Sequence, residues 1–305
     1  MKKDRIVTNV SASVRDRLLK LHRDSGIGYQ RLLNQHALER LLYRLSVSPA
    51  RNVFLLKGAM LFTVWQGSPH RMTRDLDLLG FGDPDAERLA GVFRELCAVD
   101  VAEDGIVFDP ASVQCGEIRE AARYPGVRIT MRATMGTARL NLQIDIGFGD
   151  HCSDPEEIEV PSLLGMPPPH LRAYRRETVV AEKLEAIHLL GLQNTRLKDY
   201  FDLWFLARHF HFDGKSLAAA IAATFQRRGT EFSPGLPRGL REDFWSDSRH
   251  VAEWKAFWKK AGPGGECPSL EETIRFISDF AGLPLREAAE SSGWEESWEP
   301  GGPWG

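Results

Sequence analysis

Cysteine and long apolar runs are both scarce in this sequence. Its four cysteines are scattered over 305 residues without a CxxC spacing, which argues against a zinc site or a disulfide framework and is typical of a reducing compartment. No apolar run reaches the roughly 18 residues of a membrane span. The two lysines at the start are not followed by the apolar segment of a secretory signal. We therefore predict a cytoplasmic protein that does not cross a membrane.

A large net charge is missing as well. The 39 Lys and Arg residues nearly balance 42 Asp and Glu residues, for a formal net charge of −3, which excludes a uniformly basic protein that coats nucleic acid. From Arg286 onward, five glutamates and one arginine give a local charge of −4, so the rest of the chain carries +1 and can still form a basic groove. Hydrophobic residues make up 43% of the chain, enough for a packed core, so a disordered or fibrous protein is excluded.

Apolar periodicity predicts two helices between Ser11 and Leu45. In the second, leucines recur at helical spacing and Glu39, Arg40 and Arg44 lie on the other face. A further helix is expected after residue 84, where leucine, valine and phenylalanine again recur at helical spacing.

Two short strands flank a glycine turn in the next segment. Val53–Leu56 predicts a buried strand that ends at Lys57-Gly58, and a helix begins at Ala59. Asp75–Leu79 alternates between polar and apolar residues and predicts a second strand. The order is therefore strand, glycine turn, helix, strand.

A β-hairpin with one apolar face is predicted between Val127 and Ile146. Apolar and polar residues alternate on both sides of a turn at Gly136. Asp145 lies on the polar face of the second strand, opposite the isoleucines that precede and follow it.

The second half of the chain is predicted to be helical. The segment Pro161–Pro169, with three consecutive prolines, is the expected domain boundary. An amphipathic helix is expected at Thr178–Leu192 and an aromatic-rich helix at Tyr200–Phe210, and Ser269 with Glu272 forms a capping-box pattern at the start of another.

The C-terminal end consists of Gly, Pro, Glu and Trp without periodicity, so we predict disorder for residues 286–305. Exposed tryptophans are unusual without a partner. An alternative is therefore that the tail docks a partner or covers a basic surface of the protein itself.

Two aspartates of one predicted strand have the clearest chemistry. Alternate residues of a strand project to one side, so Asp75 and Asp77 project together while Leu76 and Leu78 face the core. Adjacent carboxylates repel unless a cation lies between them, and Mg²⁺ is bound by one or two carboxylates together with substrate phosphates. Upstream, Gly58 lets backbone N–H groups approach a triphosphate at the start of a helix, where the helix dipole favours an anion.

A third carboxylate is needed for a two-metal site, in which two ions hold the attacking and leaving oxygens of a phosphoryl displacement. Asp145 is the candidate. A DxD pattern alone is weak, because such pairs are common in turns, and an EF-hand is excluded because the fifth and twelfth loop positions are Leu79 and Ala86. Combined with the glycine turn and the later strand aspartate, the pattern predicts a catalytic site.

Two widely separated pairs of segments carry a family resemblance. They are Phe54–Phe62 with Arg71–Gly80, and Ala181–Ile187 with Arg196–Leu203. These motifs resemble the AbiEii/AbiGii toxin family of nucleotidyltransferases, a branch of the polymerase-β-like superfamily. The resemblance covers roughly residues 30–210. It implies an α/β (α+β) fold with a mixed-sheet core, flanking helices and a mostly helical C-terminal part.

The resemblance also implies roles for residues of the first pair of segments. Asp75 and Asp77 are expected to bind Mg²⁺ or Mn²⁺, with Asp145 as the third carboxylate. The residues expected to bind the NTP are Lys57, Gly58, Ala59, Arg71 and Arg74. The two arginines flank the DxD pattern and can either reach the nucleotide or screen the acidic cluster, and Arg71 is the favoured nucleotide contact. The superfamily turn usually reads Gly-Ser or Gly-Gly, whereas this sequence lacks a hydroxyl at Ala59.

In the second pair of segments, the resemblance implies that Lys183 contacts nucleotide phosphate. A lysine beside a triphosphate neutralises the leaving group, whereas most helical lysines are simply solvated. Asp199 and Asp202 lie three residues apart and share a helix face. One or both are expected to complete the site, and either can instead pair with Arg196 or Lys198.

Arginines that suit phosphate by bidentate hydrogen bonding collect on the hairpin and after the predicted boundary. They are Arg119, Arg123, Arg128, Arg132, Arg139, Arg172, Arg175 and Arg176. Those at 128, 132 and 139 need not share a face with Asp145. By resemblance, the acceptor is the 3′ end of tRNA.

We thus predict a nucleotidyltransferase core over residues 1–160, a helical domain closing the cleft over 161–285, and the disordered tail. The predicted function is transfer of NMP from an NTP to an acceptor hydroxyl, most simply tRNA, by the toxin of a type IV toxin–antitoxin or abortive-infection system. The expected partners are NTP, tRNA and a cognate antitoxin, without DNA. The alternatives are transfer to a protein or small molecule, or a non-catalytic nucleotide- or RNA-binding module.

Overall fold

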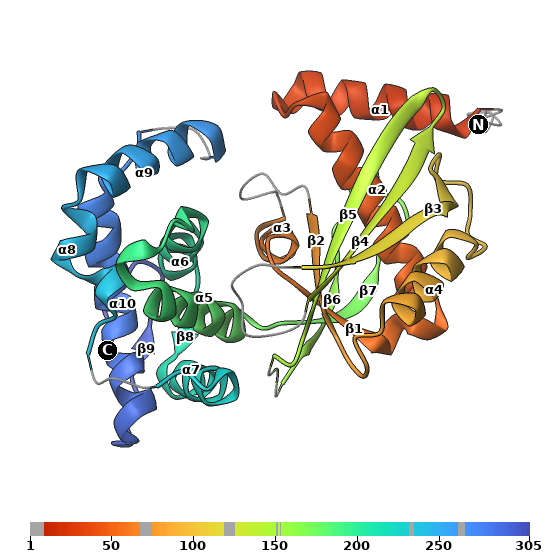
Figure 1. Cartoon of the computed structure of the whole chain (residues 1–305). Coiled ribbons are helices and arrows are strands. Elements are labelled where there is room, and N and C mark those ends of the chain that lie inside the picture. The colour runs from red at the N-terminus through yellow and green to blue at the C-terminus, as the bar shows by residue number, and fades with distance from the viewer. Residues whose placement is uncertain are drawn as a thin grey trace. The chain divides into compact units, whose positions relative to one another are not determined.

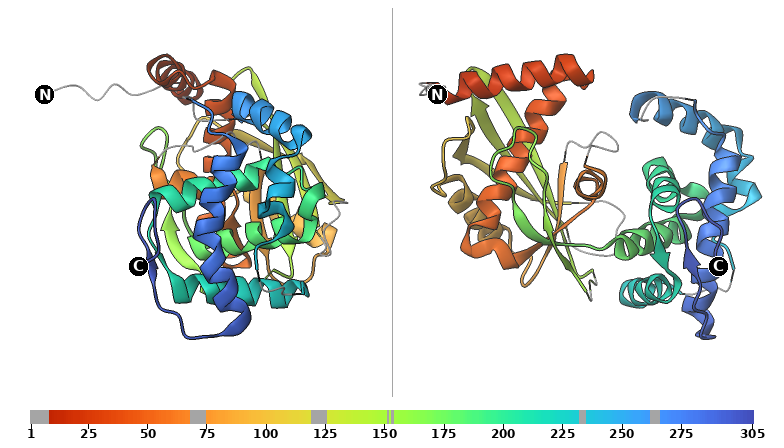
Figure 2. Two further views of the ribbon diagram at one scale, coloured as in Figure 1. Left: turned by 90° about the vertical axis from the view of Figure 1, so that its left-hand side faces the viewer. Right: turned by 180° about the vertical axis from the view of Figure 1, so that it is seen from behind.

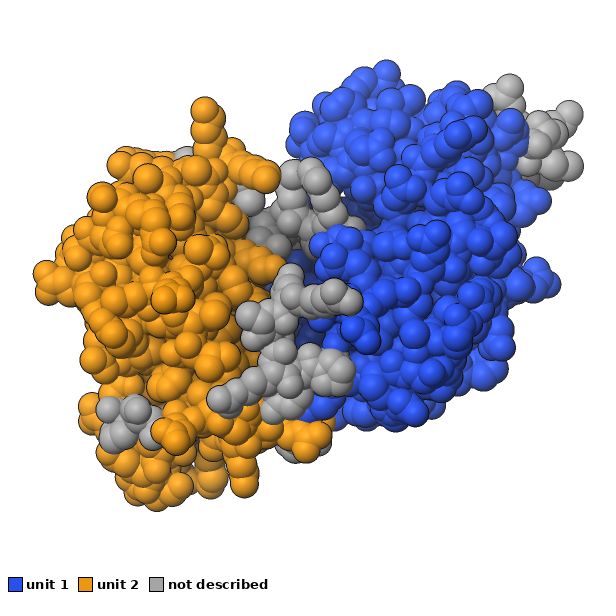
Figure 3. All heavy atoms as spheres, viewed as in Figure 1, with its two compact units in different colours: residues 1–149, 155–173 blue, residues 150–154, 174–305 orange. Residues whose placement is uncertain are grey.

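The computed structural model of the protein describes residues 9–67, 75–118, 126–150, 152, 154–231, 235–261 and 266–305. The chain divides into two compact units (Figure 3). Unit 1 comprises residues 1–149 and 155–173, and unit 2 comprises residues 150–154 and 174–305. The predicted boundary at Pro161–Pro169 is wrong, because that segment lies within unit 1 and the strand after it returns to the sheet of that unit.

Unit 1 contains a seven-stranded mixed sheet with the strand order β3-β4-β5-β2-β1-β7-β6 (Figure 1). Parallel pairs are β2 with β5 and β1 with β7, and the other neighbours are antiparallel. The strands are β1 (Phe54–Lys57), β2 (Asp75–Gly80), β3 (Val107–Glu117), β4 (Gly126–Met135), β5 (Ala138–Phe148), β6 (Glu156–Glu159) and β7 (His170–Ala173). This confirms the predicted mixed-sheet α/β fold and the hairpin, which is β4–β5.

The helices of unit 1 are α1 (Val10–Ser25), α2 (Tyr29–Ser46), α3 (Met60–Gln66) and α4 (Ala86–Cys97). The two predicted N-terminal helices and the strand–turn–helix order are therefore confirmed. Figures 1 and 2 show α2 and α4 against one face of the sheet. That face carries the buried residues Leu76, Leu78, Ile144 and Ile146, and Phe54 of β1 contacts Phe93 of α4 there.

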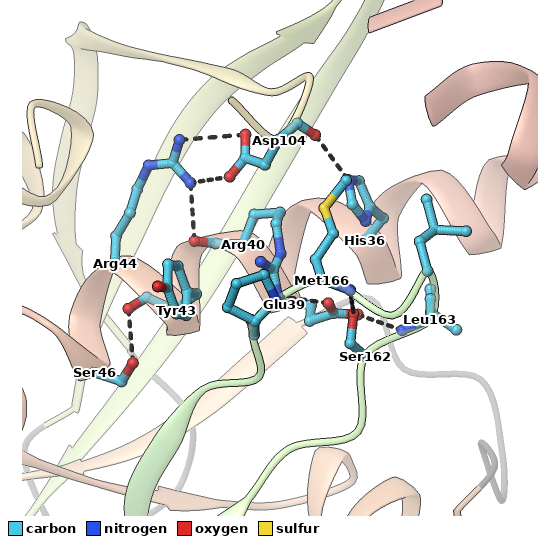
Figure 4. Close-up of polar contacts among 12 residues, drawn as sticks. His36, Glu39, Arg40, Tyr43, Arg44, Ser46, Asp104, Ser162, Leu163 and Met166 are labelled. Atoms are coloured by element: carbon cyan, nitrogen blue, oxygen red, sulfur yellow. Dashed lines mark hydrogen bonds and ion pairs between the residues drawn. The ribbon is translucent and has the colours of Figure 1, made fainter. Parts of the chain in front are cut away.

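The charged residues of α2 form a buried network (Figure 4). Glu39 and Arg40 are each only 1% exposed, and Arg44 is also buried. Arg40 donates to Glu39 and to the carbonyl oxygen of Pro167, while Glu39 accepts from the backbone N–H of Leu163 at 2.9 Å. These contacts fix the proline-rich segment to α2. Buried charges of this kind are stable only when they are paired.

The same network contains His36, which predicts a pH dependence of stability. Burial lowers the pKa of His36, although the hydrogen bond from its Nε2 to the carbonyl oxygen of Asp104 opposes this shift. Its Nδ1 atom has no hydrogen-bond partner among the described residues, so no acceptor there stabilises a second ring proton. Unfolded histidine has a pKa of about 6.5. Between that pH and the lower pKa of the folded protein, the unfolded chain binds more protons at this position than the folded chain, so stability falls as the pH falls.

We therefore expect the urea midpoint of unfolding to decrease between pH 7.5 and pH 5.5, and to decrease less in His36→Gln, which keeps a donor toward Asp104. The difference between the two proteins isolates His36 from the other histidines. Equal pH dependence in both would show that His36 does not contribute.

Unit 2 is mostly helical, as predicted. Its helices are α5 (Arg176–Leu190), α6 (Leu197–His209), α7 (Gly214–Arg228), α8 (Glu242–Trp245), α9 (Ser248–Ala261) and α10 (Leu270–Glu290). Helix α10 begins with the predicted capping box, in which Ser269 and Glu272 exchange hydrogen bonds with each other's backbone. No helix of the described residues is both long and apolar enough to span a membrane.

The prediction of a disordered tail is wrong. Residues 286–290 belong to α10, and β9 (Ser297–Trp298) pairs with β8 (Phe212–Asp213). Trp298 is 2% exposed, donates to the carbonyl oxygen of Ala207 at 2.6 Å and packs against Phe280. Isolated tryptophans give no periodic signal, yet each buries a large apolar area with a polar edge that needs a partner. The tail therefore packs on helices of its own unit.

Truncation of this anchor is expected to destabilise unit 2. Trp298→Ala should lower the free energy of unfolding by about 3–5 kcal/mol, because it removes a buried indole and leaves a cavity. Urea denaturation followed by circular dichroism measures the change. Glu299→Ala, which alters the neighbouring exposed side chain, should be close to neutral. A loss below about 1 kcal/mol for Trp298→Ala would contradict this packing.

Candidate active site

Strands β2 and β5 bring the three predicted carboxylates onto one face of the sheet. Asp75 and Asp77 are alternate residues of β2, and Asp77 is directly paired with Asp145 on the parallel strand β5. Residues paired in register on neighbouring strands project to the same face. The prediction that Asp75 and Asp77 project together is confirmed. Their face is opposite the one that α2 and α4 cover.

Two cations lie at the ends of the same row of residues. Lys57 of β1 is paired with Asp77, and Arg128 of β4 is paired with Asp145. The row across β1, β2, β5 and β4 therefore reads Lys57, Asp77, Asp145, Arg128. The sequence predicts a metal ion as the partner of these carboxylates. It did not predict that Lys57 and Arg128 flank them in the sheet.

Arg128 forms a two-point ion pair with Asp145. Its Nε and Nη2 atoms each lie 2.8 Å from a different carboxylate oxygen of Asp145. Gln143, two residues earlier on β5, donates to the same oxygens at 3.3 and 3.2 Å. The Asp145 side chain is 20% exposed and that of Arg128 is 38% exposed. The carboxylate of Asp145 is therefore held in a fixed orientation by donors of its own sheet.

The other hairpin arginines share this face as well. Counting outward from the turn, β4 and β5 pair Arg132 with Asn141 and Thr134 with Arg139 without a register shift, so Arg132 and Arg139 alternate in phase with Asp145. Arg132 also pairs with Asp109 of β3 at 3.0 Å. The sequence leaves open whether these arginines share a face with Asp145, and the strand register shows that they do.

The remaining predicted arginines have other positions. Arg172 lies on β7, Arg175 pairs with Asp154 at 2.8 Å, and the guanidinium of Arg176 lies over the ring of Phe210. Arg71, Arg74, Arg119 and Arg123 lie outside the described residues.

The turn between β1 and α3 is packed directly against Asp77. Gly58 has a φ of +73°, in the region that favours glycine. A Cβ atom added there would lie 2.0 Å from Oδ2 of Asp77. Helix α3 then begins at Met60 with Ala59 as its N-cap residue, and the Ala59 side chain makes no capping hydrogen bond. The glycine is thus required both by the backbone conformation and by the space that the carboxylate occupies.

Gly58→Ala is expected to reduce the nucleotidyl transfer that the sequence motifs predict by about 100-fold, because a displacement of about 1 Å within a site of this kind can have an effect of that size. Gly67→Ala is the matched control. Gly67 also has a positive φ of +75°, but no described residue lies within 4 Å of its added Cβ, so this variant carries the same backbone strain without the collision. Transfer rates measured on both folded variants test the contact. Equal losses would show that strain, and not Asp77, is responsible.

In unit 2, Lys183 is enclosed by the two predicted aspartates. Its Nζ atom lies 2.9 Å from Oδ1 of Asp199 and 2.8 Å from Oδ2 of Asp202. The side chains of Lys183, Asp199 and Asp202 are 13%, 1% and 0% exposed, so Lys183 is not a solvated helical lysine. Arg196 pairs with the second oxygen of Asp199 at 2.8 Å. The sequence left open which of Asp199 and Asp202 lies near Lys183, and both contact it.

Charge compensation decides the protonation states in this cluster. Burial raises the pKa of Asp199. The ammonium of Lys183 and the guanidinium of Arg196 lower it by more than burial raises it, so the pKa lies below its usual value. The Asp199 carboxyl is thus ionised at neutral pH. An ion pair this deeply buried fixes the direction in which the lysine projects from α5.

A second charged cluster of unit 2 was not predicted. Arg228 of α7 lies within 3.2 Å of Asp150, Glu182 and Glu185, and Tyr174 donates to Glu182. Burial lowers the pKa of Arg228, but the carboxylates raise it more, so the guanidinium stays charged. Asp150 and Tyr174 are the residues at which the chain passes from unit 1 into unit 2. The cluster anchors the chain at both of these crossings, and its members are too far apart in sequence to form a recognisable motif.

Among the described residues, no three His, Cys, Asp or Glu side chains converge closely enough to hold a metal ion. The engagement of Asp145 by Arg128 and Gln143 agrees with this. Asp75 and Asp77 nevertheless offer hard carboxylate oxygens on one face, which is the donor type that Mg²⁺ and Mn²⁺ prefer. The carboxylates of Asp75 and Asp77 thus fit such an ion.

Comparisons with known proteins agree with the fold and with the predicted family. Residues 40–275 match the family described as nucleotidyl transferase AbiEii toxin of the type IV toxin–antitoxin system. The solved structure of JHP933 from Helicobacter pylori is similar, with a TM-score of 0.51 and 18% identity over 87% of this chain and 96% of that chain. A second structure, described as that of a candidate nucleotidyltransferase from Helicobacter pylori, has a TM-score of 0.49 and 18% identity over 87% and 99%. No curated protein matches the sequence.

The fold and the family match define a nucleotidyltransferase. The chain belongs to the AbiEii family of nucleotidyltransferase toxins of type IV toxin–antitoxin systems. The family that the sequence motifs suggested is thereby confirmed.

Proposed function

We propose that this toxin transfers NMP from an NTP to an acceptor hydroxyl at the 3′ end of tRNA and releases pyrophosphate, with Mg²⁺ or Mn²⁺ bound at the carboxylates of unit 1. The observation that carries the proposal is the arrangement of Asp75, Asp77 and Asp145 on one face of the directly paired strands β2 and β5. Carboxylates of neighbouring strands are a suitable ligand set for ions that act on phosphate.

When bound, the divalent ion supplies positive charge for the phosphate oxygens and orients the attacking and leaving groups. Asp75 and Asp77 are the residues we assign to it, joined by Asp145. Gly58 keeps the turn after β1 close to Asp77, and with Lys57 and Ala59 it is assigned to the NTP. Arg71 and Arg74 keep their predicted nucleotide-binding roles as part of this proposal.

Lys183 is the proposed phosphate contact of unit 2. Asp199 and Asp202 act as positioning residues, because their buried carboxylates hold the ammonium by two hydrogen bonds. A positioned ammonium is a compact charge that stabilises the negative charge of a departing pyrophosphate.

The shared face of the hairpin arginines supports a polyanionic acceptor. Arg128, Arg132 and Arg139 lie on the same side of β4–β5 as Asp145, and arginine binds phosphate through bidentate hydrogen bonds. A tRNA end satisfies this chemistry. The family also implies a cognate antitoxin as a partner. We place the protein and these partners in the cytoplasm.

Incorporation of each α-³²P-labelled NTP into total tRNA, with Mg²⁺ or Mn²⁺, tests the proposal. Label on tRNA that disappears in Asp77→Asn is the expected result. Metal-dependent label on a protein or a small molecule would assign a different acceptor to the same site. NTP binding without transfer to any acceptor would overturn the enzymatic function and favour a binding module.

A further inference from the structure

We propose that Arg128 competes with the divalent cation for Asp145, so that metal loading requires this arginine to leave the carboxylate. The inference rests on the proposed function, because it concerns the metal site assigned there. It adds a residue that controls the occupancy of that site.

Contact geometry is the first reason. The guanidinium addresses both oxygens of Asp145 at 2.8 Å each, which is the fork-to-carboxylate arrangement of a strong pair. Gln143 donates to the same two oxygens. An ionised carboxylate has about four lone-pair positions, so the donors of the sheet already use most of the capacity that a metal ion would need.

Charge is the second reason. Lys57 and Arg128 flank Asp77 and Asp145 in the row, so two positive charges lie beside two of the three carboxylates assigned to the metal. A nearby cation lowers the affinity of a carboxylate for a divalent ion, because the two positive charges repel. Moving the guanidinium away from Asp145 removes this repulsion from one ligand, and it therefore raises the affinity of the site.

Partial exposure makes the displacement feasible. The side chain of Arg128 is 38% exposed, unlike the buried Arg40 and Arg44 of α2, so the guanidinium can be hydrated when it leaves. Ion pairs of intermediate exposure contribute modestly to stability. The pair is thus strong enough to weaken metal binding and weak enough to be broken.

The test measures Mn²⁺ binding to the protein by electron paramagnetic resonance in the absence of NTP. We expect Arg128→Gln to bind Mn²⁺ about 5- to 10-fold more tightly than the unmodified protein, a change of about 1 to 1.4 kcal/mol. Arg128→Lys keeps the charge but loses the two-point contact, so its affinity should lie between the two.

Arg132→Gln is the matched control. It removes the same charge from the same strand and face, but the arginine that it replaces pairs with Asp109 and not with Asp145. The Mn²⁺ affinity of this variant should change less than about 2-fold, because Arg132 lies four residues from Arg128 along β4 and salt screens its charge at the metal site. The gain from Arg128→Gln should also vanish in an Asp145→Asn background. A gain that persists there, or an Arg128→Gln affinity equal to that of Arg132→Gln, would overturn the inference.

Asp77→Asn separates this inference from the proposed function. If Asp77→Asn abolishes Mn²⁺ binding while Arg128→Gln leaves it unchanged, the metal site stands and the competition fails. If Asp77→Asn leaves Mn²⁺ binding intact, the metal site of the proposed function is itself wrong and the competition is overturned with it.

Discussion

Asp77→Asn is expected to abolish nucleotidyl transfer while the protein stays folded. Asp77 lies at the centre of the row of charged residues, paired with Lys57 on one side and Asp145 on the other. Asparagine keeps the shape of the side chain but removes the charge that a divalent ion requires. Loss of electrostatic stabilisation in the transition state commonly reduces turnover by about 10²–10³-fold for a single donor, and we expect at least about 10³-fold for this residue.

The rate of label transfer from α-³²P-NTP at saturating NTP measures this effect, with circular dichroism to confirm folding. Asp85→Asn is the control, because Asp85 is the N-cap residue of α4, which packs on the opposite face of the sheet, and asparagine caps a helix equally well. Its activity should stay within about 2-fold of the unmodified protein. An Asp77→Asn protein with more than about one tenth of the original rate would contradict the assignment of this carboxylate to the reaction.

Much of unit 1 could be predicted from local patterns. Alternation along 75–79 and 127–146 identified β2, β4 and β5, because each has one face in the core and one polar face. The same alternation placed Asp75 and Asp77 together. It did not predict that β2 and β5 are neighbours, since pairing between distant strands depends on the packing of the whole sheet and not on either sequence alone.

The ion pair of Arg128 with Asp145 was within reach of the sequence. A two-residue turn at Gly136-Thr137 pairs Met135 with Ala138, and counting outward from this pair brings Arg128 opposite Asp145. The hairpin register thus contains information that a scan for isolated motifs overlooks. It also shows that a cluster of carboxylates should be considered together with the cations in its own register.

The burial of charged residues was not predicted from the sequence. Periodicity places Glu39 and Arg40 opposite the leucines of their helix, but it does not show that a loop folds over that face and supplies the backbone partners that make burial tolerable. The tail was misassigned for a related reason. Three widely spaced tryptophans show no period, but Trp298 and Trp304 pack around Phe280.

Lys183→Met is expected to lower the free energy of unfolding of unit 2 by about 3–5 kcal/mol, the usual result of removing one partner from a buried ion pair. Asp199 and Asp202 would stay buried but lose the ammonium that bridges them. Lys198→Met changes an exposed lysine of helix α6 and should be almost neutral. Urea unfolding of both variants measures the difference.

The pH dependence of stability is an independent check of the ion pair, because its sign should differ between the unmodified protein and Lys183→Met. In the unmodified protein the lowered pKa of Asp199 contributes stability above the unfolded value of about 3.9, and this stability is lost as the pH falls through the folded pKa. In Lys183→Met, two buried carboxylates share Arg196 as a remaining cation, so burial and their mutual repulsion raise the pKa of the pair instead. The variant should therefore become more stable as the pH falls from 7 to 5, and a destabilisation that does not change with pH would contradict the ion-pair explanation.

This destabilisation changes how the role of Lys183 must be tested. A loss of transfer in Lys183→Met alone can result from unfolding of unit 2, so it does not establish a phosphate contact. The triple variant Lys183→Gln, Asp199→Asn, Asp202→Asn replaces the charged cluster by neutral groups that can still hydrogen-bond, and it should recover most of the lost stability. If the triple variant is stable but transfers label at least about 10²-fold more slowly, the charge of Lys183 acts on the reaction; a stable and active triple variant would limit the three residues to a structural role.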